Sequence, residues 1–461
     1  MNICLTYGCG IRSNEDEWKQ EILRRLPEKY NKFVMSSYKI NEIKNYDNIK
    51  YEYFYRDVDL TNIDFEEIEK WIGMPVNTII RRCWHYTRKN ISKKEYSALV
   101  KYIIKNILIW KEYFLRNRID IFYSGYESNF IEQTGHLVAE KLGIKIVFLQ
   151  VGRISDTFYI ANKDYLPIKY NILKNEAIEK YYGVFLERYK FKKKPEGEAV
   201  NKIILRKENI SIFKKFIWYF KSLLLLDKAC KKDPLREISV ISTIFDKIIF
   251  HFNRIINSFF YDRVNLNENY FFYPLHFEND ATYTLNNPLI SQKEIVSIIS
   301  KQVPSDVKLY VKSHPIYDGG DINLKDLLEM KKPNVKVISH KENSYELMKS
   351  DKCKGVIVFN STVGFECIAF NKPLISMGNE EYSKEGISVA IKNIMDFKEI
   401  MLKEITFDSH KRKIFIANYM NNLIYDVSMP FKLGKIELED EEYDKLATEL
   451  HKAINYLINN S

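Results

Sequence analysis

Residues 356–378, VIVFNSTVGFECIAFNKPLISMG, decide the fold. The apolar run that opens this stretch predicts a buried strand, residues 361–370 predict a helix, and residues 372–378 predict another strand. A strand, a helix and a strand at this spacing form a βαβ unit, whose two strands are parallel. The stretch therefore predicts part of a doubly wound α/β sheet.

The same alternation extends outward to residue 269. Strands are predicted within residues 270–276, 307–313, 335–339 and 355–360, with helices between them. Ser291 with Glu294 three residues later predicts a capping box at the start of one of these helices. Residues 266–395 are therefore expected to form one α/β domain.

A second α/β pattern occupies residues 1–170. An apolar strand at the N-terminus runs into Gly8 and Gly10, and a helix follows. A long helix is predicted over about residues 91–117, and residues 119–153 read as a further strand, helix and strand. With a helical linker at 171–265 and C-terminal helices at 396–461, the sequence predicts two α/β domains facing a cleft.

The bulk composition limits the function classes. The chain has 461 residues, a net charge of +10 and six cysteines, none of them in a C-x-x-C pair. The N-terminus lacks a signal-peptide pattern, so we expect a cytoplasmic protein without a metal site or cofactor. The basic surplus fits a nucleotide-linked substrate or peripheral contact with an anionic membrane, although Lys-rich composition alone also explains it. The lysines are dispersed and no nucleic-acid-binding motif occurs, so nucleic acid is not an expected partner.

The segment YVKSHPIYDGG, residues 310–320, places a histidine where a predicted strand ends. Lys312 lies two residues before His314 and so on the same strand face. Pro315 restricts His314 to extended geometry and fixes the direction of its imidazole. An imidazole held there can donate to a phosphate or protonate a leaving group.

A predicted phosphate site follows the strand that ends at Asn360. Ser361 and Thr362 stand at the start of a helix, where hydroxyl groups and free backbone N–H groups bind anions. Gly364 is expected to let a ligand approach closely, and Glu366 to accept from ribose hydroxyls. The alternative is that Ser361 or Thr362 is an ordinary N-cap and Glu366 compensates the helix dipole.

Other candidates follow strands of both domains. His276, with Asp280 or Glu278 after it, is expected at the same sheet edge, where an acidic side chain can orient a sugar hydroxyl; a surface loop with a structural histidine is the alternative. In the first domain Glu127 is the preferred catalytic base. Further candidates there, each equally open to a structural role, are Arg12, Glu15, Asp16, Gly152 and Arg153.

Three of these segments, 270–282, 291–315 and 356–382, together resemble the bacterial capsule polysaccharide biosynthesis proteins, which include capsular Kdo transferases. The resemblance extends more loosely to residues 119–153. It implies a GT-B-like fold with two Rossmann-like domains, the C-terminal one holding a nucleotide sugar. The His-Pro and Ser/Thr pairs are also similar to those of bacterial sialyltransferases, which implies that His314, Ser361 and Thr362 contact a CMP phosphate. His276 departs from the glutamine that the Kdo enzymes often carry in this loop.

The sequence therefore predicts a metal-independent glycosyltransferase. Its donor is a CMP- or UDP-linked sugar, and its acceptor is a surface polysaccharide or a lipid-linked glycan. Three alternatives stay open at this point: a glycerophosphotransferase of the teichoic-acid type, a sugar-nucleotide epimerase, and a non-catalytic subunit of a capsule assembly.

Overall fold

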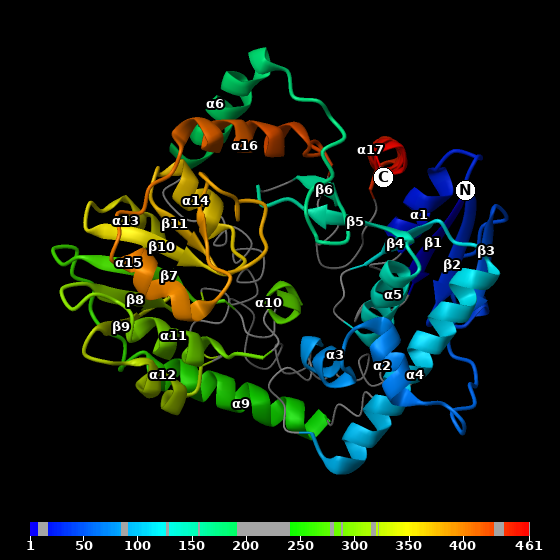
Figure 1. Ribbon diagram of the computed structural model, residues 1–461, viewed down its shortest axis with the longest axis horizontal. Coiled ribbons are helices and arrows are strands. Elements are labelled where there is room, and N and C mark those ends of the chain that lie inside the picture. The colour runs from blue at the N-terminus through cyan, green and yellow to red at the C-terminus, as the bar shows by residue number, and fades with distance from the viewer. Residues whose placement is uncertain are drawn as a thin grey trace, which may run out of the picture. The chain divides into compact units, whose positions relative to one another are not determined.

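The computed structural model (Figure 1) describes residues 1–7, 17–83, 91–125, 129–154, 157–190, 240–276, 281–286, 289–314, 320, 322–427 and 438–460. The chain forms two compact units. Unit 1 comprises Met1–Ile172, Asn287–Leu289 and Asn422–Ser461, and unit 2 comprises Leu173–Asn286 and Ile290–Asn421. Each unit is an α/β unit with its own six-stranded sheet.

Sheet A of unit 1 has the strand order β3-β2-β1-β4-β5-β6. Strands β1 to β5 are parallel to their neighbours, and β6 pairs antiparallel with β5 at the edge. The strands are β1 (Asn2–Tyr7), β2 (Asn31–Ser36), β3 (Ile49–Tyr53), β4 (Ile121–Ser124), β5 (Lys145–Val151) and β6 (Phe158–Ala161). The helices are α1 (Glu17–Arg25), η2 (Ile40–Glu42), α2 (Phe65–Ile72), α3 (Val76–Arg82), α4 (Lys93–Arg116), α5 (Phe130–Lys141) and α17 (Asp440–Asn459).

Helices cover both faces of sheet A because its strands carry apolar residues on both faces. On one face α1 and α17 pack on Ile3, Leu5 and their neighbours, in one buried cluster. On the other face Trp110 of α4 packs against Phe122 of β4, with ring centroids 5.3 Å apart. The C-terminal helix thus completes the core that the N-terminal strand begins.

Sheet B of unit 2 has the order β12-β11-β10-β7-β8-β9 and is parallel throughout. Its strands are β7 (Tyr270–Pro274), β8 (Lys308–Lys312), β9 (Val335–Ile338), β10 (Cys353–Val358), β11 (Leu374–Ser376) and β12 (Val389–Ala390). Its helices are η3 (Asn175–Ala177), α6 (Ile178–Lys190), α9 (Val240–Asn257), α10 (Ala281–Asn286), α11 (Gln292–Ser300), α12 (Leu324–Met330), α13 (Ser344–Lys349), α14 (Val363–Ala369), η5 (Ile394–Asp396), α15 (Phe397–Met401) and α16 (Ser409–Asn421).

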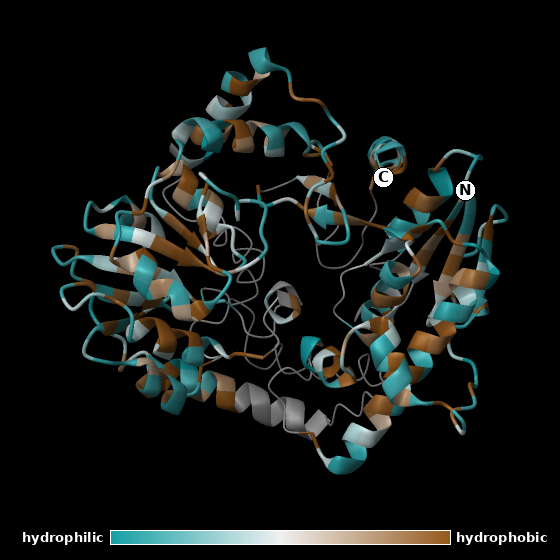
Figure 2. Ribbon diagram, in the orientation of Figure 1, coloured by the Kyte–Doolittle hydropathy of each residue, from teal (hydrophilic) through white to brown (hydrophobic). Residues whose placement is uncertain are grey.

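The core of unit 2 follows from the same two-sided burial. Alternate residues of β7, Phe271 and Tyr273, join residues of α11, α12 and α15 in one cluster. On the other face Tyr270 donates a hydrogen bond to the Leu347 carbonyl of α13 at 2.7 Å. Figure 2 shows the strands of both sheets as predominantly hydrophobic. The predicted capping box at Ser291 and Glu294 is present.

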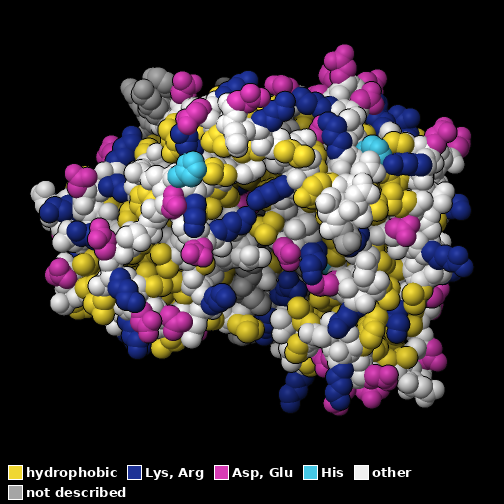
Figure 3. All heavy atoms as spheres, turned by 45° about the horizontal axis from the view of Figure 1, so that its top comes forward, with side chains coloured by type: hydrophobic (Ala, Val, Ile, Leu, Met, Phe, Trp, Pro, Cys, Tyr) yellow, Lys and Arg dark blue, Asp and Glu magenta, His cyan; other side chains and the backbone are white. Residues whose placement is uncertain are grey.

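Both units have the strand order of a Rossmann-like sheet, which confirms the predicted fold class. The sequence did not predict β2, β6 or β12. The linker predicted at 171–265 includes α6 and α9, which belong to unit 2, while residues 191–239 lie outside the described part. No helix in the described ranges is both long and apolar enough to span a membrane. Basic and acidic side chains are interspersed over much of the face in Figure 3.

Candidate functional site

The strand order of sheet B creates one topological switch point, between β7 and β10. From β7 the chain first adds β8 and β9 on one side of the sheet and then β10, β11 and β12 on the other. The connections that follow β7 and β10 therefore leave toward opposite sides and open a crevice at the carboxyl ends of these two strands. Pro274 ends β7 and Val358 ends β10, while β8 ends beside β7 at Lys312. Three neighbouring strand ends therefore define the candidate site of unit 2.

His276 links two of these strand ends. Its Nε2 accepts a hydrogen bond from the Phe359 backbone N–H at 3.3 Å, which joins the segments after β7 and β10. The side-chain amide of Gln292 on α11 accepts from the His276 N–H and donates to the His276 carbonyl. The imidazole also stacks on Tyr283, with centroids 5.7 Å apart. Because Nε2 is an acceptor here, the neutral ring carries its proton on Nδ1.

The segment after β10 is a locked turn. The Tyr382 hydroxyl accepts from the Ser361 N–H at 3.1 Å and donates to the Ser361 carbonyl at 2.9 Å. The Ser361 hydroxyl accepts from the Val363 N–H at 3.2 Å, and Gly364 N–H donates to the Ser361 carbonyl. The N–H groups of Ser361, Val363 and Gly364, expected to be free for a ligand, thus have partners inside the protein because the turn closes on itself.

Hydroxyl groups remain as ligand-facing candidates in this turn. Thr362 occupies the N-cap position of α14 but makes no side-chain cap hydrogen bond, and both Ser361 and Thr362 are half-buried. Asn360, by contrast, is buried. The N-cap alternative therefore does not describe Thr362, whereas the Ser361 hydroxyl does accept from the first N–H of α14.

Gly364 and Glu366 face the interior of unit 2. A Cβ added at Gly364 would lie 2.4 Å from the Tyr382 ring, so the glycine makes room for that tyrosine. Glu366 is only 1% exposed, and its Oε1 accepts from the Tyr345 hydroxyl at 3.4 Å. Ligand approach at Gly364 and ribose binding by Glu366 stay predictions, and the second requires the carboxylate to become exposed.

The end of β8 carries buried polar groups up to His314. The Lys312 ammonium donates to the Ser344 hydroxyl of α13 at 2.6 Å. The backbone carbonyl of Lys312 accepts from the Leu275 N–H at 2.9 Å. The buried Ser313 hydroxyl has no hydrogen-bond partner among the described residues. His314 follows as a half-buried residue. The structure thus places His314, His276 and Asn360–Thr362 after three adjacent strands.

Several predicted site residues lie outside the described residues and stay predictions: Arg12, Glu15, Asp16, Glu127, Glu278, Asp280 and Pro315. In unit 1 Gly152 is described and donates its N–H to the Thr157 carbonyl at 2.7 Å. Arg153, next to it, is half-buried. The binding of an anionic acceptor by this pair stays a prediction from the sequence.

Glu132 is a candidate that the sequence reasoning missed. It lies in the first turn of α5, directly after β4, at the switch point between β1 and β4. It is buried, and the Thr6 hydroxyl of β1 donates to its Oε1 at 3.5 Å. A Cβ at Gly125 would lie 2.2 Å from this oxygen and 2.9 Å from the Lys19 ammonium, so both charged groups crowd the glycine. The capping spacing Asn129-x-x-Glu132 was the available signal.

The described thiols are unsuited to nucleophilic chemistry. Cys4, Cys83, Cys353 and Cys367 are free and buried. Burial raises the pKa of Cys353 to about 11 and that of Cys4 to about 12. Both thiols are therefore protonated at neutral pH. No group of three or more His, Cys, Asp or Glu side chains in the described ranges is arranged to hold a metal ion.

Comparison with known families places the chain in one of them. A sequence model described as capsule polysaccharide biosynthesis protein matches residues 185–425, more than half of the chain. The chain belongs to this family. The match includes every strand of sheet B and all three strand ends of the candidate site. The family resemblance expected from the sequence is thereby confirmed.

Solved structures give weaker likenesses. The KpsC β-Kdo 2,7-transferase of Thermosulfurimonas dismutans is 14% identical with a TM-score of 0.33, covering 84% of this chain and 97% of that one. The β-Kdo 2,4-transferase of the same KpsC is 14% identical with a TM-score of 0.37, covering 77% and 96%. MnaA of S. aureus, in a structure with UDP, is 11% identical with a TM-score of 0.24, covering 99% and 97%. No curated protein matched the chain. Likenesses this distant carry no inference about function.

Proposed function

We propose that this capsule-biosynthesis protein is a glycosyltransferase that moves a sugar from a CMP- or UDP-linked donor to a polysaccharide or lipid-linked acceptor. Family membership supports the pathway. The observation that carries the donor site is the hydrogen bond from Phe359 N–H to His276, because it fixes the Ser361–Thr362 turn at the switch point beside the strand that leads to His314. Phosphate-containing ligands bind at this position in open α/β sheets.

In this reaction unit 2 must stabilise the phosphate of the nucleotide as it leaves. The bond between the anomeric carbon and the donor phosphate oxygen breaks, and the nucleotide leaves as an anion. The His314 imidazole donates to that oxygen, and the hydroxyls of Ser361 and Thr362 donate to the same phosphate. Fixed donors of this kind stabilise developing charge without a metal ion. We therefore propose that turnover needs no divalent cation.

The acceptor hydroxyl must also lose a proton as it attacks the anomeric carbon. A carboxylate is the expected proton acceptor. Glu127 is the preferred candidate from the sequence, and Glu132 is the candidate from the structure because it is held rigidly at the switch point of sheet A. Asp280 of unit 2 keeps the proposed task of orienting a sugar hydroxyl. We assign the acceptor to unit 1.

A peripheral membrane contact is the second part of the proposal, and α9 supports it. Its Asn257 is buried and donates to the Ile322 carbonyl at 2.6 Å, which anchors one face of the helix on unit 2. Phe252 and Ile255 lie on the opposite face, each 62% exposed, and Phe259 just beyond the helix is 80% exposed. Residues 247–261, between Asp246 and Asp262, contain Lys, His and Arg but no acidic residue. An apolar face with basic and no acidic residues suits an anionic lipid surface.

Vesicle sedimentation tests this contact. We expect the protein to pellet with phosphatidylglycerol vesicles and to stay in solution with phosphatidylcholine vesicles. Phe252→Glu should reduce pelleting about tenfold, because a carboxylate replaces an exposed apolar side chain that would otherwise enter the lipid surface. Leu402→Glu, at an exposed leucine on another part of unit 2, is the control. Equal pelleting of the Phe252 variant and the wild type would remove α9 from the proposal.

Mass spectrometry of donor mixtures tests the transferase. The protein is incubated with CMP- and UDP-linked sugars, with and without a glycan acceptor and with EDTA present. Release of CMP or UDP coupled to a larger glycan, undiminished by EDTA, is the expected result. A change of the donor sugar without any acceptor would instead identify an epimerase. Transfer of glycerol phosphate would identify a glycerophosphotransferase, and no turnover of any donor would favour a non-catalytic assembly subunit.

A further inference from the structure

The loop between β11 and β12, residues 377–388, carries the tyrosine that holds the turn after β10. The Tyr382 hydroxyl hydrogen-bonds both backbone groups of Ser361, and the side chain is fully buried. Its position therefore depends on what packs around the loop. Helix α16 lies beside α14 on this side of unit 2 (Figure 1) and reaches Tyr382 by two routes, one polar and one aromatic.

Arg412 of α16 begins the polar route. Its side chain is only 1% exposed. Its Nε donates to the Ile387 carbonyl at 2.9 Å, and its Nη1 donates to the Lys372 carbonyl at 2.9 Å. Lys372 lies just before β11 and Ile387 just before β12, so one guanidinium joins the segments that enter both strands. The planar group fixes the two carbonyls in a single geometry.

The charge of Arg412 is buried without a counter-charge. Among the described residues no carboxylate pairs with it, and its Nη2 has no hydrogen-bond partner. Its Cζ lies 3.5 Å from the centroid of the Phe407 ring. Burial lowers the pKa of Arg412 to about 10, which leaves it a cation at neutral pH. Because an unpaired buried charge is unfavourable, an apolar side chain would pack α16 at a lower cost. The arginine adds the two hydrogen bonds to the loop segments.

The polar route continues along the loop. Ser388 is buried, and its hydroxyl donates to the Tyr382 carbonyl at 2.7 Å. The Gly386 carbonyl accepts from the N–H of Asp408, the residue before α16, at 2.7 Å. Gly386 has a φ of +80°, and a Cβ there would lie 2.6 Å from the Lys411 side chain, so only glycine suits this contact. The start of α16 thus fastens the end of the loop that holds Tyr382.

The aromatic route runs from α16 to the same tyrosine. Phe365 of α14 packs edge-on against Tyr382, with ring centroids 5.6 Å apart. Phe415 and Tyr419 of α16 pack against Phe365, with centroids 5.9 Å and 4.7 Å apart. All four rings are buried. Because a close-packed interior transmits displacement, a shift of α16 moves Tyr382.

We propose that Arg412 is a positioning residue for the turn after β10. It keeps the Tyr382 hydroxyl on the Ser361 backbone, and α16 thereby sets the geometry in which the Ser361 and Thr362 hydroxyls meet a phosphate. The inference rests on the proposed function only for the use made of the turn. The contacts themselves require no ligand, and Arg412 acts through Tyr382.

Hydrogen exchange of residues 359–366, followed by mass spectrometry on the full chain, tests these contacts without a ligand. Arg412→Met keeps the length of the side chain but removes its donors, so the Ser361 amide should exchange about tenfold faster. Ser388→Ala removes one hydroxyl from the polar route and should accelerate the same amide about threefold. This small change keeps the test available if Arg412→Met does not fold.

Two control variants show whether faster exchange is specific. Leu327→Ala removes a buried side chain of α12, and Ser300→Ala removes a buried hydroxyl of α11 that donates to a carbonyl. Neither residue lies on either route, so both variants should leave the exchange of residues 359–366 unchanged. Unchanged exchange in both Arg412→Met and Ser388→Ala, or equal acceleration in the controls, would overturn the inference.

Titration calorimetry with CMP and with UDP connects the contacts to the donor. Arg412→Met should raise the Kd of the nucleotide that binds about fivefold, and adding Tyr382→Phe should raise it no further, because both changes break one link. A double variant in which the two effects multiply would show that Arg412 does not act through Tyr382. Faster exchange in Arg412→Met, with neither nucleotide bound by the wild type, would refute the donor site and keep the role of Arg412 in fixing the turn.

Discussion

Sheets A and B share one strand order, yet their switch points carry different chemistry. At the β7/β10 crevice of sheet B hydrogen-bonding groups predominate: an imidazole that accepts from the backbone, the half-buried hydroxyls of Ser361 and Thr362, and the buried Lys312 ammonium at the end of β8. At the β1/β4 crevice of sheet A the Glu132 carboxylate and the Lys19 ammonium crowd Gly125. Hydroxyl and ammonium donors suit a phosphate that arrives with its own charge, and a held carboxylate suits removal of a proton. The topology determines where each crevice lies, and the side chains determine which chemistry it can carry out.

The largest effect is expected at the proposed phosphate site of sheet B. His314→Ala should lower kcat for the nucleotide sugar by roughly 100-fold, because the leaving oxygen loses its proton donor. The measurement is the initial rate of nucleotide release. His410→Ala, at an exposed histidine of α16, is the control and should change nothing. Normal kcat in the His314 variant would show that the phosphate site lies elsewhere.

The proton-accepting side is tested at Glu132. Glu132→Gln keeps the shape of the side chain and one acceptor oxygen but removes the base, so kcat should fall about 30-fold. The loss should not recover as pH is raised, since the amide does not titrate. Glu140→Gln, on the same helix and exposed, serves as the control. An unchanged rate would assign Glu132 to the structure of α5 alone.

A smaller effect is expected from Tyr382, which holds the turn after β10 in place. Tyr382→Phe removes one oxygen and with it both hydrogen bonds to the Ser361 backbone. The ring still fills the space beside Gly364, so the fold should hold. We expect KM for the donor to rise about fivefold, equivalent to about 1 kcal/mol, with little change in kcat. A fall in kcat at unchanged KM would contradict a positioning role.

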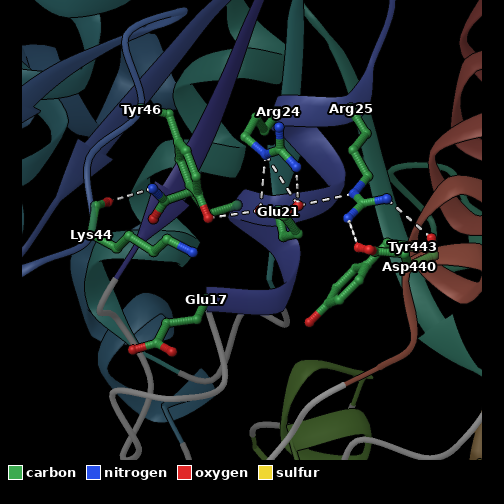
Figure 4. A pocket seen from close by; sticks show the side chains of 9 residues that line it. Glu17, Glu21, Arg24, Arg25, Lys44, Tyr46, Asp440 and Tyr443 are labelled. Atoms are coloured by element: carbon green, nitrogen blue, oxygen red, sulfur yellow. Dashed lines mark hydrogen bonds and ion pairs between the residues drawn. The ribbon is translucent and has the colours of Figure 1, made fainter.

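The smallest effect concerns the ion pairs that Glu21 forms with Arg24 and Arg25 in unit 1 (Figure 4). The pKa of Glu21 is lowered on folding to about 2, so its stabilisation is complete above the ordinary value of 4.5 and is lost as pH falls toward 2. After allowance for solvent screening we expect Glu21→Gln to cost about 1 kcal/mol of unfolding free energy at pH 7. Urea melts at pH 7 and pH 3 check this. The difference between the two proteins should shrink at pH 3, and a constant difference would contradict the pKa assignment.

The sequence predicted what depends on neighbours along the chain. The alternation of apolar runs and helical periods gave most of both sheets, and Ser291 with Glu294 gave a correct helix start. It missed β2, although residues 31–36 are buried apart from the first. That strand is short, and its partner β1 begins about thirty residues earlier. Register with a distant strand is not encoded in a local pattern.

The parts of the site that could not be predicted depend on contacts between distant residues. His276 and Phe359 are 83 residues apart, and Thr6 and Glu132 are 126 apart. Nothing in the sequence around Gly364 indicated that Tyr382 would occupy the space expected for a ligand. The sequence thus indicated which strand ends carry polar residues, while the three-dimensional contacts decided which of those residues are already engaged.

The position of α17 has a consequence for the order of assembly during translation. Its residues Leu446, Leu450 and Ile454 belong to the same buried cluster as Ile3 and Leu5. Sheet A therefore cannot close its core until the ribosome has synthesised the last helix, although its first strand emerges first. Unit 2, whose segments end at Asn421, is complete before then. The strands of sheet A that are translated first therefore lack this helical cover of one apolar face until unit 2 has been synthesised.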